Sequence, residues 1–215
     1  MGGKRFPGKV LHKIGKQSML GHCISRAKQI GHPVVVATGP FAENFPIYHE
    51  AEKYDIDCYW VEYYKNGVNL IPEDDVLLRF ILVGIMEKAD YILRICADQP
   101  FFSVEAAKEL VKCIPHGPDY VAHYETQEHF PLRPTIYYLA WGYFNELVRL
   151  EALMKSYKYA NDSEKTNVTE YIYRHPEHFV IEGIYLKELP ENRVSINTEE
   201  DLRRVEEYYK KGVLK

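Results

Sequence analysis

Tyr91-Ile92-Leu93-Arg94-Ile95-Cys96-Ala97-Asp98-Gln99-Pro100 is the stretch that decides the fold. Its first five residues are mainly apolar, as a strand buried on both faces of a sheet requires. The Asp-Gln-Pro that follows is typical of a turn. Residues 34–37, Val-Val-Val-Ala, form a second short apolar run of the same kind. Short apolar strands alternating with helical stretches predict an α/β fold, a three-layer sandwich around a mostly parallel sheet.

The same alternation continues along the whole chain. Apolar residues three and four positions apart predict helices, and short apolar runs predict strands. Ser103 is expected to cap one helix, and Thr198 with Asp201 to form a capping box on the last. No repeat or linker interrupts the pattern, so we expect residues 1–215 to be a single domain. The expected helices cover residues 17–30, 47–54, 75–88, 104–113, 140–156, 163–174 and 199–209, and the expected strands 34–37, 58–63, 91–95, 120–123, 135–139, 179–185 and 194–196.

The charge balance and the ends of the chain limit the class of protein. The 215 residues include 27 Lys plus Arg and 31 Asp plus Glu, a net charge of −4. A nucleic-acid-binding surface is normally basic, so we expect no nucleic-acid partner. We find no apolar run of membrane-spanning length and no signal peptide, which predicts a cytoplasmic protein without a membrane partner. Cys23, Cys58, Cys96 and Cys113 lie in apolar stretches without a CxxC pair, which predicts buried free thiols.

Candidate site residues follow the predicted strands. Ligands of open α/β sheets bind at the carboxyl ends of strands, so the loops after Ala37, Ile95 and Ile196 are the places to examine. Asp98 follows one strand directly, and its carboxylate suits Mg²⁺, which prefers oxygen ligands. Asn197 follows another strand, and its amide oxygen is also a possible ligand. Both residues have a simpler interpretation, as a turn or cap residue at Asp98 and as a turn-stabilising side chain at Asn197.

The first residues, Gly2-Gly3-Lys4-Arg5-Phe6-Pro7-Gly8-Lys9, combine glycine with positive charge. Glycines let the backbone approach an anion closely, and consecutive N–H groups form a concave anion site. Arg5 can bind two phosphate oxygens at once, and Lys9 adds a point charge. This pattern indicates a phosphate-binding loop, and a disordered basic tail is the alternative.

Six ordered motifs extend over nearly the whole chain. They are Arg5-Phe6-Pro7-Gly8-Lys9-Val10-Leu11, Val36-Ala37-Thr38, Asp75-Val76-Leu77-Leu78-Arg79-Phe80, Arg94-Ile95-Cys96-Ala97-Asp98-Gln99-Pro100, Asn167-Val168-Thr169-Glu170-Tyr171-Ile172 and Ser195-Ile196-Asn197-Thr198-Glu199-Glu200-Asp201-Leu202. Together they resemble the cytidylyltransferase family that includes CMP-KDO synthetases and acylneuraminate cytidylyltransferases. Within that family they are most similar to the branch of spore coat polysaccharide biosynthesis protein F. The resemblance implies a Rossmann-like nucleotidyltransferase fold.

The resemblance also implies an activity and a role for each candidate residue. The expected reaction transfers CMP from CTP to a sugar or sugar acid, with release of pyrophosphate, for surface polysaccharide biosynthesis. Mg²⁺ is the expected cofactor. The implied catalytic residues are Arg5, Lys9 and Asp98, the nucleotide-binding residues Gly2, Gly3, Thr38 and Arg79, the substrate-binding residue Arg133, and the metal ligands Asp98 and Asn197.

Several departures from the family pattern keep alternatives open. The family usually has a strand before the Gly-rich loop, so we expect the first strand to be missing from this chain. Asn197 stands where the family has a second metal carboxylate, and the presumed acceptor half, at Thr135, Tyr137 and residues 165–167, differs as well. A molybdenum-cofactor-type nucleotidyltransferase and a nucleotide-binding domain without turnover are the two alternatives. The Tyr- and Leu-rich residues 137–159 fit either a homodimer interface or the core.

Overall fold

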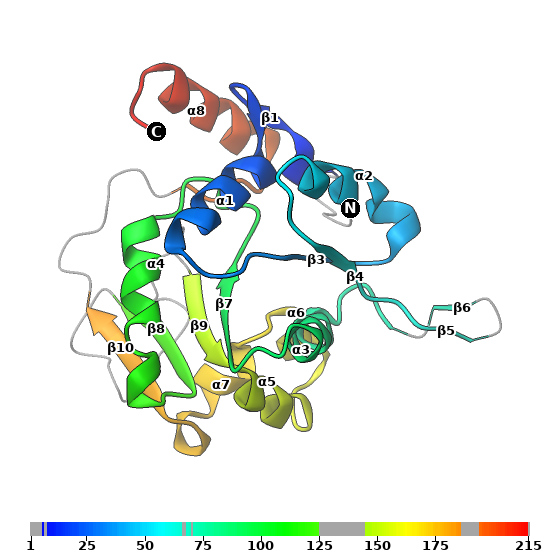
Figure 1. The fold of residues 1–215 in the computed structure, drawn as a ribbon, viewed down its shortest axis with the longest axis vertical. Helices are drawn as coiled ribbons and strands as arrows, with labels where there is room; N and C mark the ends of the chain where they lie inside the picture. Colours follow the sequence, from blue (N-terminus) through cyan, green and yellow to red (C-terminus); the bar gives the residue numbers. More distant parts are fainter. Residues whose placement is uncertain are drawn as a thin grey trace.

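A computed structural model gives the fold of residues 6, 8–65, 68–69, 71–124, 145–185 and 194–214. Helices and strands alternate along the chain, as the sequence predicts (Figure 1). The helices are α1 (Met19–Ala27), α2 (Phe41–Glu52), α3 (Val76–Met86), α4 (Val104–Val111), α5 (Leu150–Tyr157), α6 (Asp162–Thr166), α7 (Glu170–Arg174) and α8 (Glu199–Lys210), with 3-10 turns η1 (Lys9–Leu11), η2 (Lys28–Ile30), η3 (Ile114–His116) and η5 (Pro176–His178). The strands are β1 (Lys13–Ile14), β2 (Gln17–Ser18), β3 (Val36–Thr38), β4 (Cys58–Trp60), β5 (Tyr64–Lys65), β6 (Val68–Asn69), β7 (Tyr91–Ile95), β8 (Tyr120–Tyr124), β9 (Asn145–Arg149) and β10 (Ile181–Tyr185).

The largest sheet has the strand order β10-β8-β9-β7. Strand β10 pairs with β8 in parallel, whereas β9 pairs antiparallel with both β8 and β7. Strands β7, β8 and β10 therefore point the same way, and their carboxyl ends meet at one edge of the sheet. The α/β prediction is confirmed, with β9 as the reversed strand of a mixed sheet.

Helices cover both faces of this sheet. On one face, Leu110 of α4 packs with Val121 and Leu147. On the other face, Val148 packs with Leu153 of α5 and with residues of α3 and α7. Leu147 and Val148 are neighbours in β9 and point to opposite faces because side chains alternate along a strand. This alternation produces the three predicted layers, which Figure 1 shows with α4 on one side and α3, α5 and α7 on the other.

Strands β3 and β4 form a separate parallel ladder, in which Val36 is opposite Cys58. Among the described residues, no ladder joins β3 to β7. Val34, two residues before β3, instead packs with Leu93 and Ile95 of β7 in one apolar cluster that includes residues of α1 and α4. Within the described residues, the sheet is therefore interrupted between β3 and β7.

The two ends of the described chain come together. Ile14 lies in the β1–β2 hairpin, and it packs with Val194, Ile196 and Val205 in a buried cluster. Figure 1 shows β1 beside α8 at one end of the molecule. This cluster also contains Phe6, so it brings Phe6 next to the Ser-Ile-Asn-Thr segment, although almost the whole sequence separates them.

Several predicted elements need correction. Residues 145–149, in the middle of the helix expected over residues 140–156, form β9, because Leu147 and Val148 are each covered by a different helical layer. The helix expected over residues 163–174 divides into α6 and α7, and Val168 between them has a left-handed φ of 62°. Helix α2 begins at Phe41, earlier than predicted, and includes Pro46. Residues 194–196 form no ladder in the described chain, and 135–139 lie outside it.

The predicted caps are confirmed. The backbone N–H of Ala106 donates to Ser103 Oγ over 3.1 Å at the start of α4. Thr198 and Asp201 form the reciprocal capping box of α8. No helix of the described ranges is both long enough and apolar enough to cross a membrane.

Candidate functional site

The ammonium group of Lys9 lies among three oxygen atoms. Its Nζ donates to Asp98 Oδ2 at 3.0 Å, to Asn197 Oδ1 at 3.1 Å and to the carbonyl oxygen of Ile196 at 3.1 Å. The Lys9 and Asp98 side chains are 19% and 26% exposed, so solvent reaches the pair without surrounding it. Three residues that the sequence proposes separately for phosphate and metal binding therefore form one site.

The backbone around Lys9 explains how it reaches this position. Gly8 has a φ of 69°, a left-handed conformation that glycine adopts without steric cost. On the other side of the turn, the buried ring of Phe6 packs in the cluster of Ile196. The Lys9 N–H donates to the carbonyl oxygen of Phe6, and η1 follows. The Phe-Pro-Gly-Lys segment thus fixes Lys9 to the C-terminal segment of the domain.

Asp98 is positioned by the end of β7. The chain turns at once, and the Gln99 N–H donates to the Cys96 carbonyl over 3.0 Å. The Asp98 carbonyl accepts the Ile196 N–H at 2.8 Å, which joins the two segments that carry the oxygen ligands of Lys9. Asp98 is therefore at the carboxyl end of a strand, where the sequence places it.

Asn197 is oriented by hydrogen bonds on its other groups. Its Nδ2 donates to Ser195 Oγ at 3.0 Å, and its backbone N–H donates to Asp201 Oδ2 at 3.0 Å. The amide nitrogen is thereby occupied, and Oδ1 points to Lys9. The turn interpretation and the ligand interpretation of Asn197 are compatible, since the same side chain stabilises the turn and presents an oxygen to a cation.

The donor set of this site fits a hard divalent cation. A carboxylate, an amide oxygen and a backbone carbonyl already converge on a positive group, the Lys9 ammonium. Mg²⁺ binds through one or two carboxylates together with waters and substrate phosphates. Asp98, Asn197 and the Ile196 carbonyl are the atoms that would hold it, and Lys9 would have to give up its place there.

Thr38 and Arg79 form a second group. Thr38 is buried at the end of β3. A Cβ added to the next residue, Gly39, would lie 3.4 Å from Arg79 Nη2 and 3.2 Å from Asn44 Nδ2. Arg79 also donates to the carbonyl of Glu73 at 2.7 Å, and burial lowers its pKa. The guanidinium thus reaches the turn after Thr38, which brings together two residues that the sequence assigns to the nucleotide.

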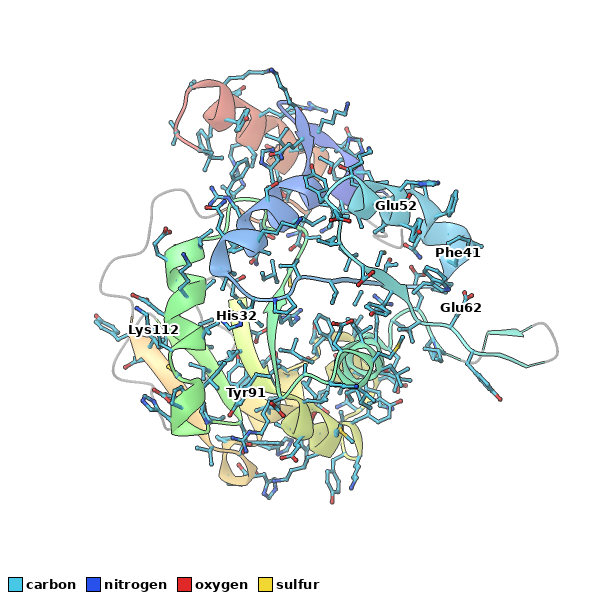
Figure 2. All side chains as sticks on the ribbon, in the orientation of Figure 1. His32, Phe41, Glu52, Glu62, Tyr91 and Lys112 are labelled. Carbon is cyan, nitrogen blue, oxygen red and sulfur yellow. The ribbon has the colours of Figure 1, made fainter. Side chains whose placement is uncertain are left out.

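Helix α2 begins directly after this turn. The Phe41 N–H, at the start of the helix, donates to Glu62 Oε2 at 3.1 Å. Figure 2 shows Phe41 and Glu62 on the same side of the molecule, beyond the ends of β3 and β4. The remaining predicted site residues, Gly2, Gly3, Arg5 and Arg133, lie outside the described residues.

Sequence reasoning missed several polar groups near the site. The carbonyl oxygen of Ile196 carries no side-chain signal that could reveal it. Gln99 is 7% exposed, and in the described structure its Oε1 has no hydrogen-bond partner. Its position next to Asp98 in the Asp-Gln-Pro turn was the signal in the sequence that could have indicated Gln99 as a site residue.

A buried charge network behind the site was also missed. Glu146 is 3% exposed and pairs with Arg94 of β7. It accepts hydrogen bonds from Tyr120 Oη at 2.6 Å and from Thr169 Oγ1 at 2.7 Å. The helix expected over residues 140–156 concealed it, because only β9 places Glu146 opposite Arg94. This network joins β7, β8 and α7 beneath the carboxyl end of β7.

An open α/β fold with oxygen ligands gathered after a strand is typical of proteins that bind their ligand at the carboxyl ends of strands. The comparison with protein families makes the class specific. The family model described as "MobA-like NTP transferase domain" matches residues 1–165 of the chain. The chain therefore belongs to the MobA-like NTP transferase family and has a nucleotidyltransferase fold.

Curated and solved relatives agree with this family. Spore coat polysaccharide biosynthesis protein SpsF of Bacillus subtilis is 25% identical over 224 residues, covering 99% of this chain and 84% of its own length. A cytidylyltransferase structure from Leptospira borgpetersenii has a TM-score of 0.78 at 18% identity, covering 98% of this chain and 83% of its own. A CMP:2-keto-3-deoxy-manno-octonic acid synthetase complexed with CTP has a TM-score of 0.70 at 13% identity, covering 98% and 95%. The structural similarities establish the fold, and the resemblance to the cytidylyltransferases is confirmed.

Proposed function

We propose that this protein transfers CMP from CTP to a sugar or sugar acid, releases pyrophosphate and depends on Mg²⁺. The observation that carries the proposal is the convergence of Lys9, Asp98 and Asn197 into one cation site at the end of β7. The names of the relatives support the chemistry, because they describe a cytidylyltransferase, a CTP-bound sugar-acid synthetase and a polysaccharide biosynthesis protein. Surface polysaccharide biosynthesis is the corresponding role.

In this mechanism a hydroxyl group of the acceptor attacks the α-phosphorus of CTP in line. The bond from the α-phosphorus to the bridging oxygen breaks, and pyrophosphate leaves. The rate enhancement comes from positioning and from stabilisation of the charge that develops on the phosphate oxygens. Asp98 and Asn197 would hold Mg²⁺, which when bound would supply positive charge to those oxygens. Lys9 neutralises phosphate charge.

The other site residues position the two substrates. Thr38 and Arg79 contact the base or ribose, since the guanidinium and the turn after β3 lie together. Gly2, Gly3 and Arg5 cradle the triphosphate, and Arg133 binds an acceptor carboxylate. These four assignments rest on the sequence alone.

The melting temperature measured with each of CTP, GTP, ATP and UTP, all with Mg²⁺, tests which nucleotide the protein binds. A ligand that binds the native state alone raises the melting temperature, so the selected nucleotide is identified directly. We expect CTP to be selected and pyrophosphate to be released when 2-keto-3-deoxy-octonic acid or a related sugar acid is added. Selection of GTP would favour the molybdenum-cofactor-type alternative. Selection of CTP without release of its pyrophosphate in the presence of any sugar or sugar acid would favour a binding domain without turnover.

A further inference from the structure

A second set of ligand-type side chains lies at the turn between α4 and β8. Cys113, His116 and Glu182 each offer one atom, and these atoms lie within 4.8 Å of one another. His116 Nδ1 is 3.1 Å from both carboxylate oxygens of Glu182. Cys113 and His116 come from one short segment, whereas Glu182 comes from β10. The arrangement therefore brings sulfur, nitrogen and oxygen atoms together from two parts of the chain.

This cluster is separate from the Lys9 site. Asp98 follows the carboxyl end of β7, whereas η3 precedes β8 and Glu182 is the second residue of β10. Because β7, β8 and β10 point the same way, the cluster lies at the opposite, amino end of the sheet. In Figure 2, Lys112, the neighbour of Cys113, lies on the α4 side, away from Phe41 and Glu62.

We propose that Cys113, His116 and Glu182 bind one Zn²⁺ ion, with a water molecule as the fourth ligand. Zn²⁺ takes thiolate, imidazole and carboxylate ligands in tetrahedral sites, and its bond lengths place neighbouring ligand atoms about 3.4 Å apart. The His116 and Glu182 atoms already meet this spacing. The side chains of His116 and Glu182 are 65% and 33% exposed, so both can close on the buried thiol without displacing the core.

The thiol must lose its proton when the ion binds. Burial and the neighbouring Glu182 carboxylate raise the pKa of Cys113 to about 11, so the metal-free site holds a neutral thiol. Zn²⁺ takes the thiolate, and the proton passes to solvent, as in other thiolate sites. The bound ion would tie the end of α4 to β10, the edge strand of the main sheet. Its role would be to stabilise this edge, apart from nucleotide chemistry.

Titration of the full chain, without an affinity tag, with Co²⁺ and Zn²⁺ tests this site. Co²⁺ bound to a thiolate gives a near-ultraviolet charge-transfer band, and we expect one equivalent of this signal, which excess Zn²⁺ removes. His116→Ala removes an exposed side chain, so the fold should be kept. Loss of even an outer partner of a metal ligand costs about 10–100-fold in affinity, so this variant should weaken Zn²⁺ binding by at least about tenfold. Cys113→Ser should abolish the band.

His49→Ala is the matched control, because the exposed His49 also pairs with a carboxylate, Glu52, at 2.7 Å, but within the described residues no third ligand-type side chain joins this pair. It should bind Zn²⁺ like the unmodified protein, and Zn²⁺ should raise the melting temperature of both but not of His116→Ala. No charge-transfer band in the unmodified protein would overturn the proposal. A band that persists in both Cys113→Ser and His116→Ala would overturn it equally.

Discussion

Lys9 Nζ lies 3.0 Å from Asp98 Oδ2, although 89 positions separate the two residues in the sequence. In the proposed reaction, Mg²⁺ would compete with the ammonium group for the same oxygen atoms, and Lys9 would then be free to contact the triphosphate. The free protein would keep its carboxylate neutralised by this internal cation until both arrive.

Replacement of Lys9 by Ala tests its phosphate role. Removing a charge-assisted contact that forms in the transition state should cost about 2–4 kcal/mol, or roughly 30- to 1,000-fold in kcat/KM. Lys9→Arg, which keeps the charge, is the matched control and should retain more activity. Steady-state kinetics of pyrophosphate release measure both. Near-normal kinetics in the Ala variant would count against a phosphate role.

Asp98→Asn should abolish Mg²⁺-dependent activity while the fold stays intact. The carboxylate is partly exposed and lies in a turn, so its loss removes no core packing. The backbone bond from Ile196 N–H to the Asp98 carbonyl remains. Activity across a range of Mg²⁺ concentrations and the melting temperature are the two readouts. A variant that unfolds would show that Asp98 is a structural turn residue instead.

Asn197→Asp should tighten Mg²⁺ binding. The variant places a second carboxylate opposite Asp98, and divalent cations bind more tightly as ligand charge increases. Calorimetric titration of Mg²⁺ in the presence of a non-hydrolysable CTP analogue measures the change. Ser195→Ala is a useful comparison, since it removes the hydroxyl that orients the Asn197 amide and leaves the charge unchanged. An unaltered Mg²⁺ affinity in Asn197→Asp would argue that residue 197 does not touch the ion.

The Glu146 network should contribute strongly to stability. Glu146→Ala leaves Arg94, whose side chain is 21% exposed, without this partner. Breaking a fully buried pair costs about 3–5 kcal/mol, so we expect a loss at or below the lower end of that range. Tyr120→Phe removes a single hydrogen bond to the carboxylate and should cost about 1–3 kcal/mol. Urea denaturation gives both values. Equal and small losses in the two variants would show that Glu146 is not the centre of the network.

Acid should destabilise the protein through two buried histidines. Burial lowers the pKa of His123 and of His22 in the folded state. Their unfolded pKa is about 6.5. The folded state favours the neutral form, so its stability is full above this pH and is lost as pH falls through the lower folded values. The free energy of unfolding should decrease from pH 7 toward pH 5.

His123→Leu isolates one of these contributions. His123 is 1% exposed, and the Glu109 carboxylate, 3.6 Å away, opposes the effect of burial. The variant should show a shallower loss of stability on acidification, with His22 accounting for the remainder. Denaturation curves at several pH values provide the comparison. Identical pH dependence in the variant and the unmodified protein would contradict a role for His123.

Much of the site was accessible from the sequence because local patterns mark the ends of strands. The turn at Asp98, the capping box at Thr198 and the Gly8-Lys9 dipeptide are each encoded by neighbouring residues, and all three are found in the structure. Glu146 was not accessible, since residues 145–149 have a pattern that fits either a helix or a strand. Only the covering helices on both faces decide in favour of β9.

The sequence by itself determined the α/β class, most of the helices and strands, and the residue types that we propose to bind phosphate and cations. These features depend on side-chain periodicity and turn chemistry, which act over a few residues. The tertiary structure alone decided that Lys9 fills the oxygen site of Asp98 and Asn197, and that Cys113 and His116 meet Glu182. Contacts between distant segments depend on how buried clusters pack, such as the one that joins Phe6 to Ile196, and no local pattern encodes that packing.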